Sequence, residues 1–222
     1  MPPSLDTLMY WIGQSAVVLM AAAGVLEAGR KRFDLFGTVL IAVAAALGGG
    51  SVRDLLLARP VFWVGDQTYL ICAVSAALVT FFLARVFVLP ARLFLIPDAA
   101  GLALFSVAGT KAALVCGAPW LVASVMGVVT GVVGGILRDV LCNEEPLVFQ
   151  GTLYATAAWA GALALIGLLA LGLDGRIAAL LAGSGIFLLR VAAIRWDIGL
   201  PRFTAKGGLS ALIISPPTRA GS

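Results

Sequence analysis

Hydrophobic residues run along the chain in seven long stretches, separated by short polar segments. Each stretch is close to the roughly 20 apolar residues that a helix needs to cross a bilayer. Charged residues and prolines mark the starts of the fourth and sixth stretches, as expected of segment boundaries. They are Arg92, Pro97 and Asp98 at the fourth, and Glu144, Glu145 and Pro146 at the sixth. The seven predicted helices cover residues 8–28, 35–58, 68–89, 94–116, 120–142, 151–172 and 175–195. The pattern predicts an all-α integral membrane protein with seven transmembrane helices.

Composition supports this class. Of 222 residues, 61% are hydrophobic and only 12% are charged, and there is no histidine. A soluble domain carries about 25% charged residues. No basic region precedes the first apolar stretch, so we expect it to remain as a membrane span rather than to be cleaved as a signal peptide.

Basic residues predict the orientation, because Lys and Arg near span ends stay on the cytoplasmic side. With seven spans, most of them fall in loops on one side, whereas only Arg59 and Arg176 fall in loops on the other. We therefore expect an N-terminus outside and a C-terminus in the cytoplasm. The net charge of +4 follows from this bias, so no nucleic-acid partner is expected. The residues on the predicted cytoplasmic side are Arg30, Lys31, Arg32, Arg85, Arg92, Arg190, Arg195, Arg202 and Lys206.

Three cysteines, Cys72, Cys116 and Cys142, lie in or at the ends of the predicted spans. They have no close spacing to one another and no histidine to accompany them. We interpret them as small buried hydrophobic residues and predict neither a metal site nor a cofactor.

The chain contains an internal repeat, seen where LGGGSVRD at 47–54 recurs as VVGGILRD at 132–139. Each copy belongs to the second helix of a three-helix unit. Since three spans are an odd number, the second unit enters the membrane from the opposite side. The predicted fold is two inverted three-helix repeats plus one extra helix. The predicted units are residues 1–92, 93–173, 174–197 for the seventh helix and 198–222 for a cytoplasmic tail. In one constant register, the matched residues are Gly24 with Gly109, Gly49 and Gly50 with Gly134 and Gly135, Arg53 and Asp54 with Arg138 and Asp139, and Tyr69 with Tyr154.

Inverted repeats of this kind occur in transporters and channels, with the functional site at the repeat interface near mid-membrane. Glycine costs about 1 kcal/mol relative to alanine inside a helix, so clustered glycines favour a bend or a break. Charged residues inside spans face the protein interior or a water-filled cavity. We therefore expect the second and fifth helices to bend around an aqueous route lined by the Arg–Asp pairs. The predicted kinks are Gly48, Gly49, Gly50, Gly131, Gly134 and Gly135.

Adjacent residues in a helix point about 100° apart and do not face each other well. One hypothesis is therefore that each arginine pairs with the aspartate of the other repeat, across the pseudo-two-fold axis that relates the two units. Arg53 would then lie near Asp139, and Arg138 near Asp54. The alternative is that each arginine extends along its flexible stem to the nearer membrane interface.

Lys111 is another charge inside a span, deep in the fourth predicted helix. We interpret it as pore-lining; the alternative is a lysine reaching the outer interface. Glu27 and Asp34 flank the cytoplasmic end of the first helix and are interpreted as boundary charges.

Six segments, taken in order, carry a resemblance to a known family. They are AGVLEAGRKRFDLFG, LGGGSVRDLLL, PVFW, DAAGLALFSVAGTKAAL, GVVGGILRDVL and IRWDIGLPRF. Together they resemble the trimeric intracellular cation channel family in its bacterial branch, across essentially the whole chain.

This resemblance implies a symmetric homotrimer in the bacterial inner (plasma) membrane, with a separate pore inside each protomer. It implies K⁺ and Na⁺ as conducted ions and the glycine-kinked second and fifth helices as the pore wall. The candidate pore-lining residues are Arg53, Asp54, Lys111, Arg138 and Asp139.

A secondary transporter of a small solute, such as glycine or another small amino acid, stays open as an alternative, because inverted repeats serve alternating access equally well. An enzyme is not expected. The chain lacks histidine, a nucleophile elbow and a carboxylate pair at a useful spacing, and Asp54 and Asp139 each follow an arginine directly.

Overall fold

The apolar stretches fold into seven long helices joined by short turns, in the part of the chain that the structure describes. The structure is a computed structural model and describes residues 5–87, 90 and 92–201. Arg202, Lys206 and most of the predicted tail lie outside these residues. The long helices are α1 (Leu5–Ala28), α2 (Leu35–Leu56), α4 (Thr68–Val86), α5 (Leu95–Val115), α6 (Trp120–Leu141), α7 (Ala155–Ala170) and α8 (Gly175–Trp196).

Six of these helices are long and apolar enough to cross a membrane. The sixth predicted span, residues 151–172, is shorter in the structure, because α7 has only 16 residues. Residues 151–154 instead form a turn, in which Thr152 makes an isolated bridge with Gly199 at the end of α8. The predicted class, an all-α membrane protein with seven apolar helices, is confirmed.

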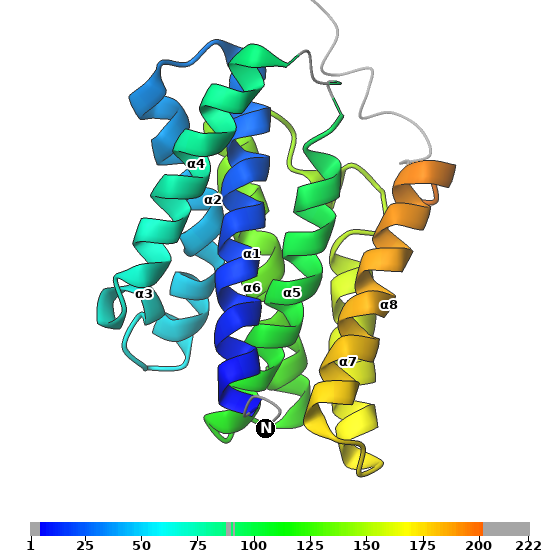
Figure 1. Ribbon diagram of the computed structural model, residues 1–222. Coiled ribbons are helices and arrows are strands. Elements are labelled where there is room, and N and C mark those ends of the chain that lie inside the picture. Colours follow the sequence, from blue (N-terminus) through cyan, green and yellow to red (C-terminus); the bar gives the residue numbers. More distant parts are fainter. Residues whose placement is uncertain (1–4, 88–89, 91, 202–222) are drawn as a thin grey trace, which may run out of the picture.

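The two three-helix units are α1, α2, α4 and α5, α6, α7, and they run in opposite directions, as the repeat predicts (Figure 1). Four helices, α1, α2, α5 and α6, pack against one another in the centre of the bundle. The third helix of each unit lies outside this centre: α4 packs on α1 and α2, and α7 packs on α5 and α6. Helix α8 lies beside α5 and α7 and stands outside the repeat.

Local sequence signals fix several helix ends. The Asp34 carboxylate accepts a hydrogen bond from the N–H of Gly37 at 2.7 Å and caps α2. Asp174 caps α8 in the same way, through the N–H of Arg176 at 2.9 Å. These caps satisfy amide groups that have no partner inside the helix. Asp34 is thus a boundary charge, as predicted.

Three short turns were not predicted. They are η1 (Gly29–Lys31), α3 (Phe62–Gly65) and η2 (Leu147–Phe149). The last two follow α2 and α6 and occupy equivalent positions in the two units, so the repeat extends into the loops.

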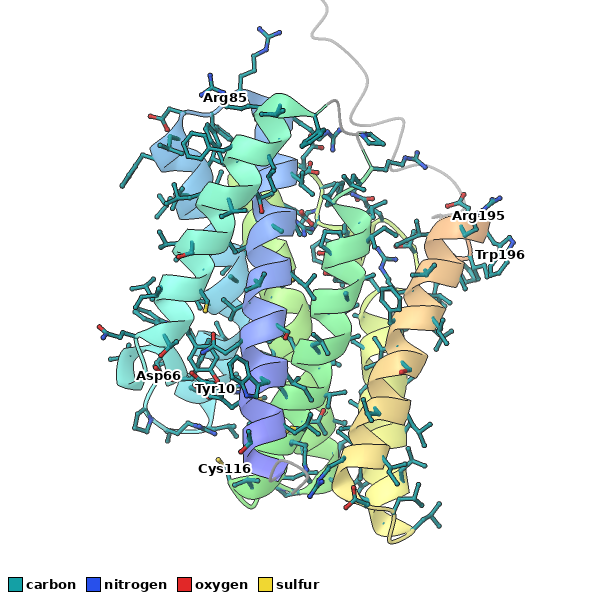
Figure 2. All side chains as sticks on the ribbon, viewed as in Figure 1. Tyr10, Asp66, Arg85, Cys116, Arg195 and Trp196 are labelled. Atoms are coloured by element: carbon teal, nitrogen blue, oxygen red, sulfur yellow. The ribbon has the colours of Figure 1, made fainter. Side chains whose placement is uncertain are left out.

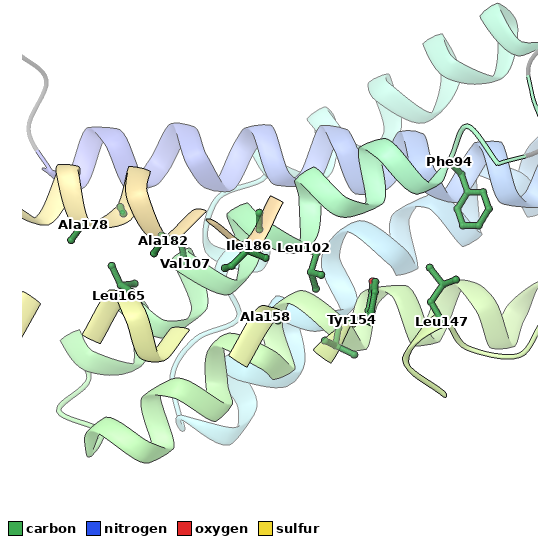
Figure 3. Packing of buried hydrophobic residues seen from close by; sticks show 13 residues of the cluster. Phe94, Leu102, Val107, Leu147, Tyr154, Ala158, Leu165, Ala178, Ala182 and Ile186 are labelled. Atoms are coloured by element: carbon green, nitrogen blue, oxygen red, sulfur yellow. The ribbon is translucent and has the colours of Figure 1, made fainter. Parts of the chain in front are cut away.

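Each half has its own hydrophobic core. In the second half, Phe94 and Leu147 lie at one end of a buried cluster, which continues through Leu102 to Ala178 on α8 (Figure 3). In the first half, a smaller cluster forms around Val17 and Met20 of α1. Both clusters reach into the central four helices: the second-half cluster includes Leu102 of α5 and Val132 of α6, and the first-half cluster includes Phe105 of α5.

The two ends of the bundle differ in their side chains. Arg85, Arg195 and Trp196 lie at one end, whereas Tyr10, Asp66 and Cys116 lie at the other (Figure 2). The ends of α4 and α8 with their basic residues therefore share a side, as the orientation argument requires.

Candidate functional site

Two buried Arg–Asp pairs lie at equivalent positions near the C-terminal ends of α2 and α6. Arg53 Nε donates to Asp54 Oδ1 at 2.7 Å, and Arg138 Nε donates to Asp139 Oδ1 at 2.8 Å. The terminal nitrogen Nη2 of each arginine contacts the same oxygen, at 2.7 Å and 2.8 Å. Each arginine thus holds its own neighbour through two nitrogens.

The second oxygen of each aspartate fixes the loop that follows the helix. Asp54 Oδ2 accepts from the N–H of Phe62 at 2.8 Å, and Asp139 Oδ2 accepts from the N–H of Leu147 at 2.9 Å. Both acceptor–donor pairs are eight residues apart in sequence. The recurring Arg–Asp motif therefore stabilises the C-terminal end of each helix and the turn that follows it, in addition to placing charged groups inside the protein.

The backbone repeats this geometry. Ala58 and Asn143, four residues after the aspartates, both have left-handed φ values, of 51° and 53°. The N–H of the next residue donates to the carbonyl of the aspartate, at 3.0 Å in the first unit and 2.9 Å in the second. This is the Schellman arrangement at a helix C-terminus.

The hypothesis that Arg53 pairs with Asp139, and Arg138 with Asp54, is wrong. Because α2 and α6 run in opposite directions, the two pairs lie toward opposite ends of the bundle, too far apart for such a contact. The alternative, an arginine extended to the membrane interface, is also wrong: Arg138 is 0% exposed and Arg53 is 7% exposed.

The second pair belongs to a larger buried network. Arg138 Nη1 also donates to Asp98 Oδ1, and the Tyr154 hydroxyl donates to the same oxygen at 3.2 Å. The guanidinium of Arg190 lies over the Tyr154 ring, 4.6 Å from its centroid, and donates to Thr152 Oγ1 at 3.2 Å. All the charged groups of this network are at most 3% exposed.

Sequence reasoning missed two members of this network. It read Asp98 as a boundary charge and Arg190 as a cytoplasmic basic residue, whereas both are buried. A signal for Arg190 existed: with Ala182 and Ile186 it forms an i, i+4 row on the buried face of α8. For Asp98 the signal was in the internal repeat: position 98 corresponds to Gly13, so a charged residue replaces a glycine of the first unit at this position.

The glycines of α2 and α6 bring the two helices close together. A Cβ at Gly49 would overlap the carbonyl oxygen of Thr130, and a Cβ at Gly134 would overlap that of Ala45. A Cβ at Gly48, by contrast, would meet only the end of the Leu137 side chain. Both helices continue unbroken through their glycines, so no break occurs there. The predicted kinks stay a prediction, and the role that the contacts give these glycines is close packing.

One cavity, of about 360 Å³, opens at the end of the bundle where α1 begins. We call it the Lys111 cavity. Arg53, Arg59 and Lys111 line it, and no carboxylate among the described residues does. Its other lining residues are Met9, Tyr10, Gly13, Gly50, Phe62, Tyr69, Phe105, Ala108, Ala112 and Val115.

A second cavity, of about 380 Å³, opens at the opposite end, and we call it the Glu27 cavity. Five carboxylates and three guanidinium groups line it in the described part of the chain. Its charged lining residues are Glu27, Asp139, Glu144, Glu145, Asp197, Arg30, Arg92 and Arg190. The two cavities therefore have opposite charge: the Lys111 cavity is basic and the Glu27 cavity carries an excess of acid.

Glu27 is not the boundary charge that the sequence indicated. It is 2% exposed, and its Oε1 accepts from Arg30 Nη1 at 2.8 Å. Its Oε2 is buried and has no hydrogen-bond partner among the described residues. Because an unpaired buried carboxylate oxygen is costly, Glu27 is a candidate to interact with an ion in this cavity.

An ion pair between Lys31 Nζ and Glu144 Oε1, at 2.7 Å, joins the end of α1 to the loop after α6 beside this cavity. The hydrogen bond and charge of Lys31 lower the pKa of the Glu144 carboxyl. At the opposite end, the equivalent positions are Cys116 and Arg59, whose Sγ and Nη1 lie 3.9 Å apart. The ionic link of one end is thus replaced by a weak polar contact at the other.

Metal ligands do not cluster in the described ranges, where no group of three or more Cys, Asp or Glu side chains could hold a metal ion.

The family model described as "Glycine transporter" matches residues 10–85 and again residues 95–170. The second match starts and ends where the register of the internal repeat places the first.

Two curated bacterial relatives cover most of the chain. A UPF0126 membrane protein of Vibrio cholerae is 42% identical over 209 residues, covering 90% of this chain and 85% of the relative. The UPF0126 inner membrane protein YadS of Escherichia coli K12 is 39% identical over 202 residues, covering 88% of this chain and 96% of the relative.

Solved structures share the fold. The TRIC trimeric intracellular cation channel orthologue from Rhodobacter sphaeroides superposes with a TM-score of 0.83 at 38% identity, over 86% of this chain and all of that one. A prokaryotic TRIC channel gives a TM-score of 0.82 at 26% identity, over 88% of this chain and all of that one.

Proposed function

This chain belongs to the family of bacterial membrane proteins that includes the prokaryotic TRIC cation channels, and on that premise we propose that it is a channel for monovalent cations. The conducted ions in this proposal are K⁺ and Na⁺. The resemblance to TRIC channels spans nearly the whole chain and both repeats, so the elements of those channels have counterparts here.

The observation that carries the proposal is the pair of cavities at opposite ends of the bundle, each associated with one of the two Arg–Asp pairs. They have similar volumes, 360 and 380 Å³, and together involve both repeats. We propose that the ion pathway joins them through the centre of the four-helix group α1, α2, α5 and α6. Its proposed lining residues are Arg53, Asp54, Lys111, Arg138 and Asp139.

Between the cavities the centre is packed, and we propose that the pathway opens when the side chains there move. Met20 is 0% exposed and lies against α5 and α6: a Cβ at Gly101 would meet its Cγ and Sδ at 2.6 Å, and a Cβ at Gly134 would lie 3.7 Å from its Cε. Methionine is flexible and can move aside at small cost. We expect Met20→Ala to raise the fraction of time that the pathway is open.

The protein lies in the plasma membrane, as its inner-membrane relatives do. We propose a homotrimer with an outside N-terminus and a cytoplasmic C-terminus, so that the Lys111 cavity faces outward. Cys116, which we interpreted from the sequence as a buried residue, is exposed at that end. A membrane-impermeant maleimide should therefore label intact spheroplasts, and Cys116→Ser should abolish the labelling. Labelling only after the membrane is opened would reverse the orientation.

Recording in planar bilayers tests the main proposal. Purified protein should give unitary steps of current, with a reversal potential that follows the K⁺ gradient. An absence of such steps, together with saturable solute uptake into proteoliposomes, would overturn it.

Charge variants at the two cavities sharpen this test because they should act in opposite directions. Removing a cation from the path raises local cation concentration, and removing a carboxylate lowers it. Lys111→Gln should raise K⁺ conductance by about twofold or more at low salt, and Glu27→Gln should lower it by a similar factor. Arg85→Gln, on the exposed end of α4 outside both cavities, is the matched control. Equal currents in all three variants would contradict the proposed path.

A second candidate is a secondary transporter of a small solute such as glycine, which the description of the family model favours. Saturable, gradient-driven uptake of labelled glycine without unitary currents would select it. The similar proteins are membrane proteins and channels, and we expect no enzymatic activity.

A further inference from the structure

The second repeat shows how this scaffold holds a carboxylate. Asp98 Oδ1 accepts from Arg138 Nη1 and from the Tyr154 hydroxyl. Nε of this guanidinium donates to Asp139 Oδ1, and Nη2 lies 2.8 Å from the same oxygen. The carboxylate of Asp98 is thus bound by an arginine that is already held in place by its neighbour.

The first repeat has the matching arginine and tyrosine but no carboxylate at the equivalent position. In the register of the internal repeat, Arg138 corresponds to Arg53, Tyr154 to Tyr69, and Asp98 to Gly13. Arg53 uses Nε and Nη2 to hold Asp54, as its counterpart does, and these contacts leave Nη1 unused. An equivalent carboxylate would lie in the space beside Gly13, which Tyr69 partly fills: a Cβ at Gly13 would stand 3.1 Å from the Tyr69 hydroxyl oxygen, so Tyr69 must shift slightly to admit a ligand there.

This space is part of the Lys111 cavity, which Gly13, Arg53 and Tyr69 all line. Arg59 and Lys111 add two further basic groups to its wall. Among the described residues, Asp54 is the carboxylate that pairs with both arginines, with Arg59 Nε 3.4 Å from its Oδ1, so two guanidinium groups share one carboxylate. The volume of the cavity is about 360 Å³. That volume lies within the range of about 300–1,000 Å³ that is typical of ligand pockets.

We propose that the Lys111 cavity binds a small carboxylate, which Arg53 and Tyr69 hold in the position that Asp98 occupies in the second repeat. Lys111 contributes a further positive charge to the same anion. The ligand class is a monocarboxylate of a few heavy atoms, either a simple acid anion or the carboxylate of an amino acid. The site follows from the geometry of the cavity, so it does not depend on the conducted species.

Direct binding tests this site without any measurement of current. Purified protein in a chloride-free sulfonate buffer should bind radiolabelled acetate saturably. Displacement by unlabelled glycine would identify a site open to amino acids, whereas a failure of glycine to compete would restrict it to simple acids; both results support the carboxylate site. Absence of saturable acetate binding, or equally effective displacement by chloride, would overturn it.

A built-in carboxylate provides the matched variant. Gly13→Asp should fill the position and weaken acetate binding at least tenfold. Gly65→Asp adds the same charge near the same end, where a Cβ would meet nothing within 4 Å, and should bind acetate as the wild type does. If Gly13→Asp does not fold, Lys111→Gln serves instead and should weaken binding about tenfold. Wild-type affinity in a folded Gly13→Asp protein, or in Lys111→Gln, would contradict the proposal.

Discussion

The two halves of this protein share one backbone plan but differ at the centre of each unit. In the second half, Arg138 is fully buried and binds two carboxylates, and Tyr154 completes the network. In the first half, Arg53 binds one neighbouring carboxylate and lines an open cavity. One side-chain difference that contributes to this contrast is Asp98 in the second half against Gly13 in the first.

The comparison of the two halves separates residues that stabilise the fold from residues that would act on ions in a pathway. The features that both halves share, the Arg–Asp pair, its bond to the next loop and the close glycine contact, hold helices and turns in place. The features that differ, the charge of each cavity and the occupant of position 13 or 98, determine which ions meet each end. We therefore expect matched variants in the two halves to have equal effects at shared positions and unequal effects at the others.

The largest inequality is expected at the arginines. Arg138→Met leaves Asp98 and Asp139 buried without a cation between them, and breaking a buried pair in this way costs about 3–5 kcal/mol. Arg53→Met leaves Asp54 with Arg59 and should cost about 1.5–3 kcal/mol, the scale of a charged hydrogen bond. Unfolding of the two variants in detergent measures the difference. Equal losses would show that the halves are energetically alike.

The glycines of α2 and α6 should give equal losses of stability in the two halves, because both lie at the same contact between these helices. Gly49→Ala and Gly134→Ala each place a methyl group on a backbone carbonyl of the facing helix. Overpacking of this kind costs about 1–3 kcal/mol, and we expect the two losses to agree. Gly48→Ala, which meets only a flexible leucine side chain, should cost less and serves as the control in the same unfolding assay. A difference between the two halves larger than this control effect would break the symmetry of the contact.

The tyrosines should differ by a smaller amount. Tyr154→Phe removes a hydrogen bond to the buried Asp98 carboxylate. A hydrogen bond to a charged group contributes about 1.5 kcal/mol or somewhat more. Tyr69 makes edge contacts with the rings of Tyr10 and Phe62, and these survive in Tyr69→Phe. Thermal unfolding should therefore distinguish the first variant from wild type and not the second. A larger loss in Tyr69→Phe would refute this ranking.

The smallest expected effect is on the stability of the protein at acidic pH. Since Lys31 lowers the pKa of Glu144 below its ordinary value of 4.5, the pair stabilises the folded protein above about pH 4.5. That contribution is lost as pH falls through the lower folded value. Glu144→Gln should reduce the drop in melting temperature between pH 6.5 and pH 3.5. Glu145→Gln, whose parent side chain makes none of the ion pairs in the described chain, is the control and should keep the full drop.

The sequence predicted the helices well because apolar runs of this length have few other structures available in a bilayer. The predicted starts of α2, α4, α6 and α8 agree with the structure to the residue. The end of the second predicted span, residue 58, overshoots because Ala58 already belongs to the turn that closes α2. Short turns such as α3 escaped prediction, since four residues carry no periodic signal.

The candidate site was harder to predict because burial depends on neighbours from other helices. Asp98 follows a proline near a helix start, where carboxylates are common, and its partners Arg138 and Tyr154 come from α6 and from the turn before α7. The geometry of the Arg–Asp pairs was not predicted either. Each aspartate accepts a hydrogen bond from a backbone N–H eight residues later in the following loop, and this bond orients the carboxylate toward its own arginine. The residues chosen from the repeat nevertheless lie on or beside the two cavities: Arg53 and Lys111 line one, and Asp139 lines the other. Their role in conduction stays a prediction.

The left-handed turn after each Arg–Asp pair has a practical consequence for protein engineering. Asparagine tolerates this backbone conformation better than alanine does, and the left-handed region costs an ordinary residue about 1–2 kcal/mol. The second half already has Asn143 there, whereas the first half has Ala58. Placing asparagine at the equivalent position of the first half, as Ala58→Asn, should raise the thermal stability of the protein and so help purification and crystallisation. Neither cavity should change.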